Sequence, residues 1–441
     1  MTGKPDKYQK KILLLTSAAG GGHVQAAKAK TLKALRENPN ASIIQKDLLV
    51  DCVNKPFGKL IVRIWNFSQK KGYLKVLTIL NQNLFLADFL CWIPIFIHIF
   101  RTLIKEDVDQ VIDTQPVGTS AIIKAIRCAK YIKKKPILLE KIVTELPTDQ
   151  ILYFFKPIKA LSANDRNCLQ LITTAPLLKK DQTAEAFWQK NCNLSENEVS
   201  YEDFPLRPIF EKYKKSQNKA YERMKIYIQF SSLQEKQLIE NTIKKGTATP
   251  EIYLDRISLS IEPDDKVSTI LLGSQPTEEA TIKYVTNFIA MAKKMGNQTT
   301  KHQLFVFCNQ HSEQKNSLLK RIHDLIQKIK EFPKNLNIIP MCFQGDDVIA
   351  PLYYRSNATF TRSGGLTAME LMTVAQGQIW IHSELKITPL NKLDLSRGMP
   401  VWERGNAYYL KAMKGAEFIT PDTFCETCAS YFFDTSQKLS S

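Results

Sequence analysis

A short run near the N-terminus constrains the fold more than any other feature, because it predicts a strand, a glycine turn and a helix in succession. Residues 11–15 read Lys-Ile-Leu-Leu-Leu, which is typical of a buried strand in a parallel sheet. Residues 20–22 are glycines, which permit backbone angles and close approaches that a Cβ excludes. The alanine-rich residues 24–35 favour a helix that begins at this turn. We therefore predict an anion or a developing negative charge beside the turn, where His23 could hold or take a proton.

Composition sets the broad class of the protein. The chain has 441 residues, too many for one ordinary core, so we expect two domains. Its hydrophobic content of 44% and charged content of 24% are typical of a globular protein. The chain has 61 Lys and Arg residues and 43 Asp and Glu residues, which gives a net charge of +18. This charge predicts an anionic partner, which could be a nucleic acid, an anionic membrane surface or a phosphorylated substrate.

The cysteines and the N-terminus bear on the compartment. Nine scattered cysteines lack the spacing of a secreted disulfide scaffold, so we expect reduced thiols in a cytosol-like compartment. Cys425 and Cys428 form a single CxxC without a second pair for zinc, and we interpret them as incidental cysteines on a helix face. The sequence shows no apolar secretory segment before the first strand, and we predict no bound metal.

Residues 76–100 have the most unusual composition in the chain. They end in an apolar run of about a dozen residues that Pro94 interrupts, short of the ~20 that a spanning helix needs. Basic residues flank the segment on both sides: Lys70, Lys71 and Lys75, then Arg101 and Lys105. Two interpretations stay open, a surface that meets anionic lipid and a buried helix hairpin with basic ends.

Strands and helices alternate through the first half of the chain. Strands are expected at residues 41–49, 109–116 and 136–147, and helices at 56–73 and 121–131. This alternation predicts a doubly wound parallel sheet, whose ligands gather beyond the carboxyl ends of the strands. One crevice should therefore be shared by the loops at 20–23, 114–119 and 145–149.

The pattern breaks near residue 204 and resumes near residue 267. Residues 211–223 are lysine-rich and read as a linker or a connecting helix, and residues 226–266 give weak signals. Further strands are expected at 267–272, 303–308 and 336–340, with helices at 278–295 and 317–332. We predict an N-terminal domain at 1–210 and a C-terminal domain at 211–441, in which 211–266 is an uncertain linker or insertion.

A second informative motif follows a strand expected at residues 359–361. Arg-Ser-Gly-Gly at 362–365 precedes a helix, with Thr367 as the predicted N-cap and Glu370 three residues later, which is a capping-box pattern. The capping box alone could explain why position 370 is a glutamate. Alternatively, the N–H groups of residues 364 and 365 bind a diphosphate while Glu370 accepts hydrogen bonds from ribose hydroxyls.

These features resemble the GT-B glycosyltransferases, and more narrowly the group of monogalactosyldiacylglycerol synthases, processive diacylglycerol glucosyltransferases and MurG. Residues 16–27 follow the TSxxGGGHxxAA signature of the diacylglycerol branch. Residues 362–367 with Glu370 match that branch, and residues 400–407 are similar to its glutamine-rich loop ending in Gly-Asn. The resemblance covers most of the chain apart from about residues 211–266.

The resemblance implies an α/β, GT-B fold with two Rossmann-like doubly wound domains facing across a cleft. It also implies an inverting, metal-independent transfer of a hexose from a UDP-sugar to a membrane lipid such as diacylglycerol, without a cofactor. His23 and Glu145 would activate the acceptor, since such a transfer needs a base for the acceptor hydroxyl. The implied donor site consists of Gly21, Gly22, Gly273, Ser274, Arg362, Ser363, Gly364, Gly365, Thr367, Glu370, Glu403, Gly405 and Asn406.

The sequence departs from the family pattern in three places. Residues 273–277 are less glycine-rich than in relatives, and Pro276 removes an N–H that a phosphate could use. Trp402 precedes Glu403 where MurG has paired glutamines, which leaves the sugar open. Residues 379–384 are polar and look irregular where relatives have a short apolar strand.

Other functions stay open alongside lipid glycosylation. They are a GT-B enzyme with a soluble or protein acceptor, an enzyme similar to UDP-GlcNAc epimerases, and a catalytically degenerate lipid- or nucleic-acid-binding protein. The sequence has neither an RNA-binding aromatic signature nor a helix-turn-helix, so we expect no nucleic acid. We expect a cytoplasmic protein, peripheral on the inner face of an anionic membrane through residues 76–100.

Overall fold

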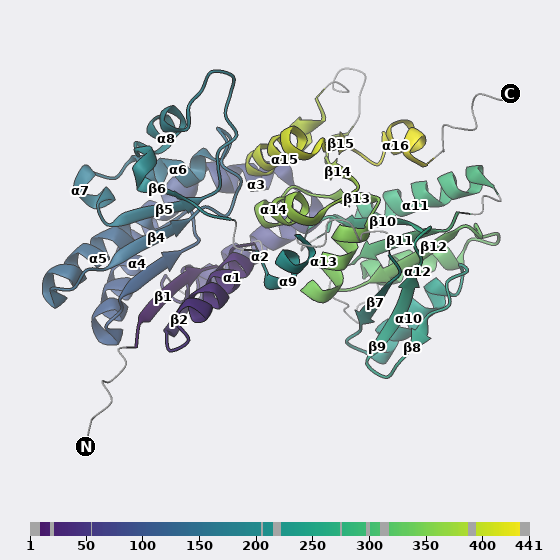
Figure 1. Cartoon of the computed structure of the whole chain (residues 1–441), viewed down its shortest axis with the longest axis horizontal. Coiled ribbons are helices and arrows are strands. Elements are labelled where there is room, and N and C mark those ends of the chain that lie inside the picture. Colours follow the sequence, from purple (N-terminus) through teal and green to yellow (C-terminus); the bar gives the residue numbers. More distant parts are fainter. Residues whose placement is uncertain are drawn as a thin grey trace. The chain divides into compact units, whose positions relative to one another are not determined.

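The computed structural model describes residues 9–17, 22–53, 55–203, 206–214, 222–273, 276–296, 300–308, 317–386 and 394–432 (Figure 1). The chain forms two compact units. The first holds residues 1–68, 75–207 and 364–369, and the second holds residues 69–74, 208–363 and 370–441.

The first unit is built on a six-stranded parallel sheet. Its strands are β1 (Lys11–Thr16), β2 (Ser42–Asp47), β3 (Gln110–Asp113), β4 (Leu138–Ile142), β5 (Leu169–Thr173) and β6 (Val199–Tyr201). They lie in the order β2-β1-β3-β4-β5-β6, with Leu13 opposite both Ile44 and Val111. Residues 12–15 are fully buried, as expected for a strand covered on both faces. The order of the strands reverses between β1 and β3, which makes their carboxyl ends the switch point of this sheet.

Helices connect these strands. They are α1 (Gly22–Glu37), α2 (Lys55–Lys71), α3 (Leu74–Gln82), α4 (Leu84–Glu106), α5 (Thr119–Lys133), α6 (Leu152–Lys159), α7 (Ala163–Arg166) and α8 (Ala184–Cys192), with a 3₁₀ turn at Glu196–Glu198. Helix α4 packs on α5, and Trp92, Phe96 and Phe100 stack along it with centroid separations of 5.3 and 5.9 Å. The expected interruption at Pro94 is wrong, because α4 continues through this residue to Glu106.

The second unit holds another six-stranded parallel sheet. Its strands are β10 (Lys266–Leu271), β11 (His302–Phe307), β12 (Leu336–Met341), β13 (Ala358–Thr361), β14 (Gln378–His382) and β15 (Glu417–Ile419). Their order is β12-β11-β10-β13-β14-β15, so the switch point lies between β10 and β13. The two sheets confirm the predicted α/β class and the two Rossmann-like doubly wound domains.

The helices of the second unit complete its core. They are α9 (Pro208–Lys214), α11 (Glu278–Met295), α12 (Leu318–Gln327), α13 (Asp346–Arg355), α14 (Gly365–Val374), α15 (Val401–Lys414) and α16 (Phe424–Phe432), with a 3₁₀ turn at Leu395–Gly398. Residues 365–369 at the start of α14 are grouped with the first unit. Phe360 of β13 packs within 5.6 Å, centroid to centroid, of Tyr284, Phe288 and Phe424. As expected, Cys425 and Cys428 lie on a helix, α16, and the cysteines are free thiols.

Much of the weakly patterned segment 226–266 is well-formed structure. It contains β7 (Met224–Gln229), α10 (Leu233–Ile243), β8 (Glu251–Ile252) and β9 (Arg256–Ile261), and the strands form an antiparallel sheet in the order β7-β9-β8. Ile226, Ile228 and Ile257 belong to the same buried cluster as Val267 and Leu304 of the large sheet. This segment is therefore part of the core of the second unit.

Two further expectations about local structure are wrong. Residues 378–382 form the buried strand β14, because the sheet accommodates their polar side chains, among them His382, through hydrogen bonds described below. Thr367 lies inside α14, which begins at Gly365. The N–H of Ala368 donates to the Gly364 carbonyl at 2.9 Å, so the helical hydrogen bonds begin before Thr367. Thr367 is therefore not an N-cap, and the capping box with Glu370 does not form.

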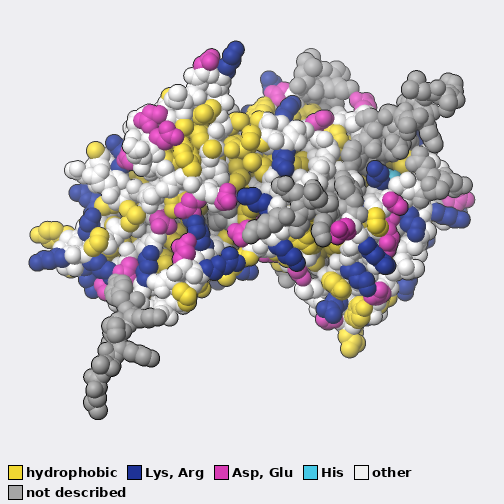
Figure 2. Space-filling model, in the orientation of Figure 1, with side chains coloured by type: hydrophobic (Ala, Val, Ile, Leu, Met, Phe, Trp, Pro, Cys, Tyr) yellow, Lys and Arg dark blue, Asp and Glu magenta, His cyan; other side chains and the backbone are white. Residues whose placement is uncertain are grey.

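Charged side chains of both signs are dispersed over one face of the molecule. On the face seen in Figure 2, Lys and Arg side chains are interspersed with Asp and Glu over both units. In the part of the chain that the structure describes, no helix combines the length and hydropathy needed to cross a bilayer.

Candidate functional site

His23 lies at the switch point of the first sheet. It is the second residue of α1, and its Nδ1 lies 2.7 Å from the carbonyl oxygen of Thr114, which directly follows β3. The Oγ1 of Thr144, two residues after β4, lies 3.2 Å from the same nitrogen. The ring of His23 therefore contacts the predicted 114–119 loop and Thr144, the residue before the predicted 145–149 loop. Gly22 begins α1, whereas Gly21 lies outside the described residues.

The contacts of His23 set its protonation state. A carbonyl oxygen only accepts hydrogen bonds, so Nδ1 carries the hydrogen and Nε2 of the neutral ring carries the lone pair. Desolvation is the main cause that lowers the pKa of His23 to about 4, the hydrogen bond to Thr114 opposes it, and the charge of Lys141 lowers it further. The ring is therefore neutral at pH 7 and can accept a proton at Nε2.

Glu145, the predicted acidic partner, is partly buried in the loop after β4 and adjoins Thr144. The hydrogen bonds of His23 go to Thr114 and Thr144, so a backbone carbonyl and a hydroxyl hold the ring. Sequence reasoning located both loops but did not single out the two threonines, because a threonine in a loop carries no distinctive signal. The role of Glu145 stays a prediction.

A buried ion pair lies beside His23 and was missed by the sequence analysis. Lys141 Nζ lies 2.5 Å from Asp113 Oδ2, and both side chains are 0% exposed. Lys141 also donates to the carbonyl oxygen of Gln115, and Asp113 Oδ1 accepts the N–H of Gln115 at 2.9 Å. Charged residues inside otherwise apolar strands are rare, and that signal could have identified this pair.

In the second unit, Arg362 and Glu403 bring two predicted segments together. Arg362 follows β13, and its Nη2 and Nε donate to the two carboxylate oxygens of Glu403 on α15 at 2.7 and 3.1 Å. Ser363 Oγ donates to the Glu403 carbonyl at 2.7 Å, and Asn406 Nδ2 donates to the Ser363 carbonyl at 2.8 Å. The Arg-Ser-Gly-Gly loop is thus fastened to residues 401–407, which form the start of a helix.

The other predicted donor-site residues lie on the same elements or beside them. Gly273 follows β10 with φ +84°, an angle that glycine adopts readily, and a Cβ there would lie 4.0 Å from Arg362. Gly364 and Gly365 precede and begin α14, Glu370 is buried on α14, and Gly405 is buried on α15. Ser274 lies outside the described residues.

The pairing of Arg362 changes what this site can offer a diphosphate. Burial lowers the pKa of the guanidinium, but Glu403 and Glu384 outweigh burial and raise it above its ordinary value. Its positive charge is balanced by the carboxylate of Glu403, which leaves less of that charge for an anion. Among the described residues, we find no cluster of three or more His, Cys, Asp or Glu side chains that could hold a metal ion.

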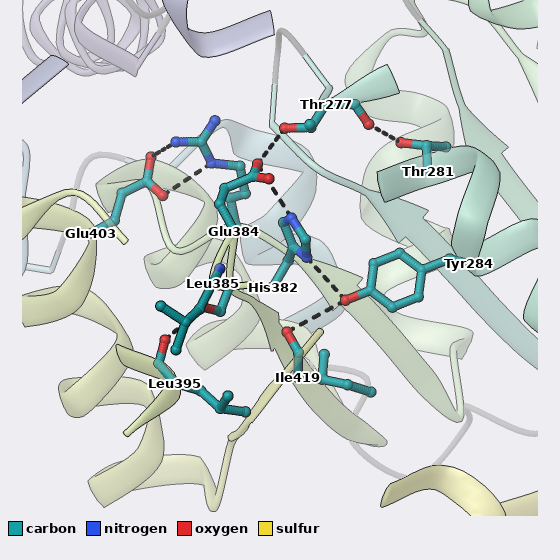
Figure 3. Close-up of polar contacts among 11 residues, drawn as sticks. Thr277, Thr281, Tyr284, His382, Glu384, Leu385, Leu395, Glu403 and Ile419 are labelled. Carbon is teal, nitrogen blue, oxygen red and sulfur yellow. Dashed lines mark hydrogen bonds and ion pairs between the residues drawn. The ribbon is translucent and has the colours of Figure 1, made fainter. Parts of the chain in front are cut away.

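A second polar cluster, not predicted from the sequence, lies beyond the end of β14 (Figure 3). Thr277 Oγ1 donates to Glu384 Oε1 at 2.5 Å, and His382 Nε2 lies 3.2 Å from the same oxygen. The Tyr284 hydroxyl contacts His382 Nδ1 at 3.0 Å and the Ile419 carbonyl at 3.4 Å. Burial alone would raise the pKa of Glu384, but His382, Thr277 and Arg362 lower it to about 2.

Replacing Glu384 with glutamine is expected to destabilise the protein in a pH-dependent way. A carboxylate whose pKa falls from 4.5 to about 2 on folding stabilises the folded state above pH 4.5, and this stability is lost as the pH falls through 2. The Glu384→Gln variant should lose up to about 3 kcal/mol at pH 7 and less than half of that at pH 3. Urea unfolding of both proteins at the two pH values measures the difference.

Glu251→Gln is the matched control, because Glu251 pairs with Lys225 at an exposed position. It should show no comparable loss at pH 7. An equal loss for Glu384→Gln at both pH values would contradict the assigned charge state of Glu384.

Comparisons with known proteins give only distant similarities. No family model and no curated protein matches the sequence. MurG from Acinetobacter baumannii aligns with a TM-score of 0.42 and 13% identity, over 97% of this chain and 91% of that one. A UDP-GlcNAc 2-epimerase from Neisseria meningitidis bound to UDP-GlcNAc gives 0.40 and 13%, over 93% and 95%. The lipopolysaccharide outer core galactosyltransferase WaaB gives 0.35 and 10%, over 97% and 96%. Values this low establish no shared activity.

Proposed function

We propose that this protein is an inverting glycosyltransferase that moves a hexose from a UDP-sugar to a hydroxyl of a membrane lipid such as diacylglycerol. The observation that carries the proposal is the fastening of the Arg362 loop to α15 through Glu403, Ser363 and Asn406. It joins the two segments that the family resemblance assigns to the sugar nucleotide. The junction also lies beside the β10–β13 switch point, where Rossmann-like sheets bind nucleotides.

The proposed reaction uses His23 and the start of α14. His23 Nε2 takes the proton of the acceptor hydroxyl while the hydroxyl oxygen forms a bond to the anomeric carbon. The bond between that carbon and the β-phosphate oxygen breaks, and UDP leaves with the electron pair. N–H groups at the start of α14 stabilise the charge that develops on the diphosphate, so no metal is required.

Helix α4 supports a membrane acceptor. Its outward residues Leu86, Leu90, Ile93 and Ile97 recur at helical spacing, and Phe89 beside them is 77% exposed. Its opposite stripe of Cys91, Ile95, Ile99 and Leu103 is buried. The segment is thus neither a buried hairpin nor fully exposed, because one face packs into the unit and the other offers apolar side chains.

Helix α2 repeats this arrangement with basic neighbours. Leu60, Ile64 and Phe67 recur along it at helical spacing and are exposed, and the adjacent Lys59 and Arg63 are exposed as well. Exposed apolar side chains with nearby Lys and Arg are the composition of helices that lie on anionic membranes. These exposed residues support the proposal that the protein binds the inner face of a membrane.

The triple variant Phe89→Ser/Leu90→Ser/Ile93→Ser is expected to bind anionic vesicles about 100-fold more weakly, since each side chain contributes roughly 1 kcal/mol on burial in lipid. Vesicle flotation with phosphatidylglycerol-containing liposomes measures the affinity. Leu254→Ser is the control, because Leu254 is 94% exposed on the second unit. Unchanged binding of the triple variant would remove α4 from the proposed membrane surface.

A transfer screen tests the proposed reaction itself. The full-length protein is incubated with a panel of UDP-sugars and vesicles of a lipid extract, and the products are identified by mass spectrometry. A glycosylated lipid supports the proposal, whereas glycosylation of only a soluble or protein acceptor refutes the lipid part of it.

A further inference from the structure

The buried pair of Lys141 and Asp113 calls for an explanation beyond stability. The two residues lie opposite each other in the parallel register of β3 and β4, and both side chains are fully buried. Removing two charges from water is expensive, and apolar residues of similar volume often serve a core equally well. The position of the pair, beside the contacts of His23, suggests what else it does.

Asp113 binds the peptide group whose carbonyl accepts the hydrogen bond of His23. The N–H of Gln115 donates to Asp113 Oδ1 at 2.9 Å, and the carbonyl of Thr114 accepts from His23 Nδ1 at 2.7 Å. These two groups belong to one planar peptide unit, in which a trans bond points the N–H and the C=O in opposite directions. The carboxylate on one side therefore fixes the direction of the carbonyl on the other and polarises it as an acceptor.

Lys141 fixes the next peptide group and the carboxylate. Its Nζ donates to the Gln115 carbonyl and to Asp113 Oδ2, so the segment from Thr114 to Gln115 is held at successive polar groups. Lys141 also brings a positive charge close to His23. Two further charged groups adjoin the contacts of the ring: Asp113, which holds the Gln115 N–H, and Glu145, which follows Thr144 in the loop after β4.

We infer that Asp113 and Lys141 are positioning residues that act through the Thr114–Gln115 peptide to keep His23 in the neutral, Nδ1-protonated tautomer, with Nε2 ready to take a proton. This inference rests on the proposed role of His23 as the base. Asp113 orients the Thr114 carbonyl. Lys141 holds the Gln115 carbonyl and the Asp113 carboxylate, and its positive charge disfavours protonation of the His23 ring.

Nitrogen-15 NMR of histidine-labelled full-length protein tests the inference directly. In the wild type, the His23 signals should show a protonated Nδ1 and an unprotonated Nε2 at pH 7. The Lys141→Met variant should show a mixture of tautomers and a proton affinity of His23 that rises on the order of tenfold or more. Its kcat should fall on the order of tenfold, with KM for the UDP-sugar unchanged, since only the proton acceptor is disturbed.

Two further variants separate the hydrogen bonds that Lys141 makes from the effect of its positive charge. Lys141→Gln keeps an amide donor but removes the charge, so it should raise the proton affinity of His23 and preserve the tautomer. The double variant Asp113→Asn/Lys141→Gln buries no charge and retains an acceptor for the Gln115 N–H, and it should behave likewise even if Lys141→Met does not fold. Lys30→Met is the matched control, because Lys30 is also buried and ion-paired, to Glu202 at 2.8 Å in the same unit. It should leave the His23 signals unchanged.

The outcomes distinguish this inference from the proposed function. A wild-type proton affinity of His23 in the double variant would overturn the inference, as would a wild-type tautomer in a folded Lys141→Met variant, whatever the activity. Absence of sugar transfer by the wild type would refute the proposed function and leave the NMR result to decide the tautomer control.

Discussion

Replacing His23 with alanine is expected to lower the rate of sugar transfer by about 10²–10⁴-fold, the usual contribution of a general base, and to leave UDP affinity unchanged. The reason lies in the geometry of the ring. Nδ1 is committed to the Thr114 carbonyl, so Nε2 is the atom that can take the acceptor proton. UDP affinity should not change because the proposed nucleotide contacts lie on α14 and α15 and do not include His23. Initial rates and calorimetric titration with UDP measure the two quantities.

His98→Ala is the control for this experiment. His98 also lies in the first unit, on α4, and burial lowers its pKa as it does that of His23. Its loss should change the rate by less than about threefold, because no acid–base role is assigned to it. A His23→Ala variant that is folded and keeps wild-type turnover would contradict the role of His23 as the base.

Replacing Glu403 with alanine is expected to destabilise the protein by about 3–5 kcal/mol, the range for breaking one partner out of a buried ion pair. Arg362 would be left buried without the carboxylate that now accepts two of its N–H groups. We also expect weaker UDP binding, because the Arg362 loop would no longer be held against α15. Urea unfolding and UDP titration test the two effects on the same variant.

The pair Arg397–Asp394 provides the comparison, since it is a similar ion pair whose side chains are 72% and 43% exposed. Asp394→Ala should cost less than about 1 kcal/mol. The double variant Arg362→Met/Glu403→Leu should regain most of the lost stability, because it leaves no unpaired buried charge. Unchanged unfolding of Glu403→Ala would show that the buried pair does not hold the loop as described.

The sequence predicted the parallel sheets because their strands are apolar on both faces. Residues 11–15 and 303–307 are examples, and both are buried strands in the structure. The antiparallel sheet of β7 and β9 was missed because polar and apolar residues alternate along β7, with buried Ile226 and Ile228 between exposed residues. Strand β14 was missed because His382 looks polar in the sequence but finds partners inside the fold.

Only those residues of the candidate site that belong to local motifs could be predicted from the sequence. Local patterns and the family resemblance identified His23, the Arg362 loop and residues 400–407, and the structure joins the last two through Glu403. The supporting contacts depend on which strands become neighbours. Asp113 and Lys141 are 28 residues apart and meet only because β3 pairs with β4 in a given register. Such pairings follow from the three-dimensional fold, and the local pattern marks only a charged residue inside an apolar strand.

Proton and phosphorus NMR of one reaction mixture tests the central claim most directly. It contains the full-length protein, a UDP-hexose with an α-anomeric linkage, and vesicles of diacylglycerol with an anionic lipid. The proposed inverting transfer predicts equal amounts of UDP and of a glycolipid with a β-anomeric linkage, formed in parallel and dependent on His23. A glycolipid that retains the α-linkage, epimerisation of the sugar nucleotide without an acceptor, or no consumption of any UDP-hexose would contradict it.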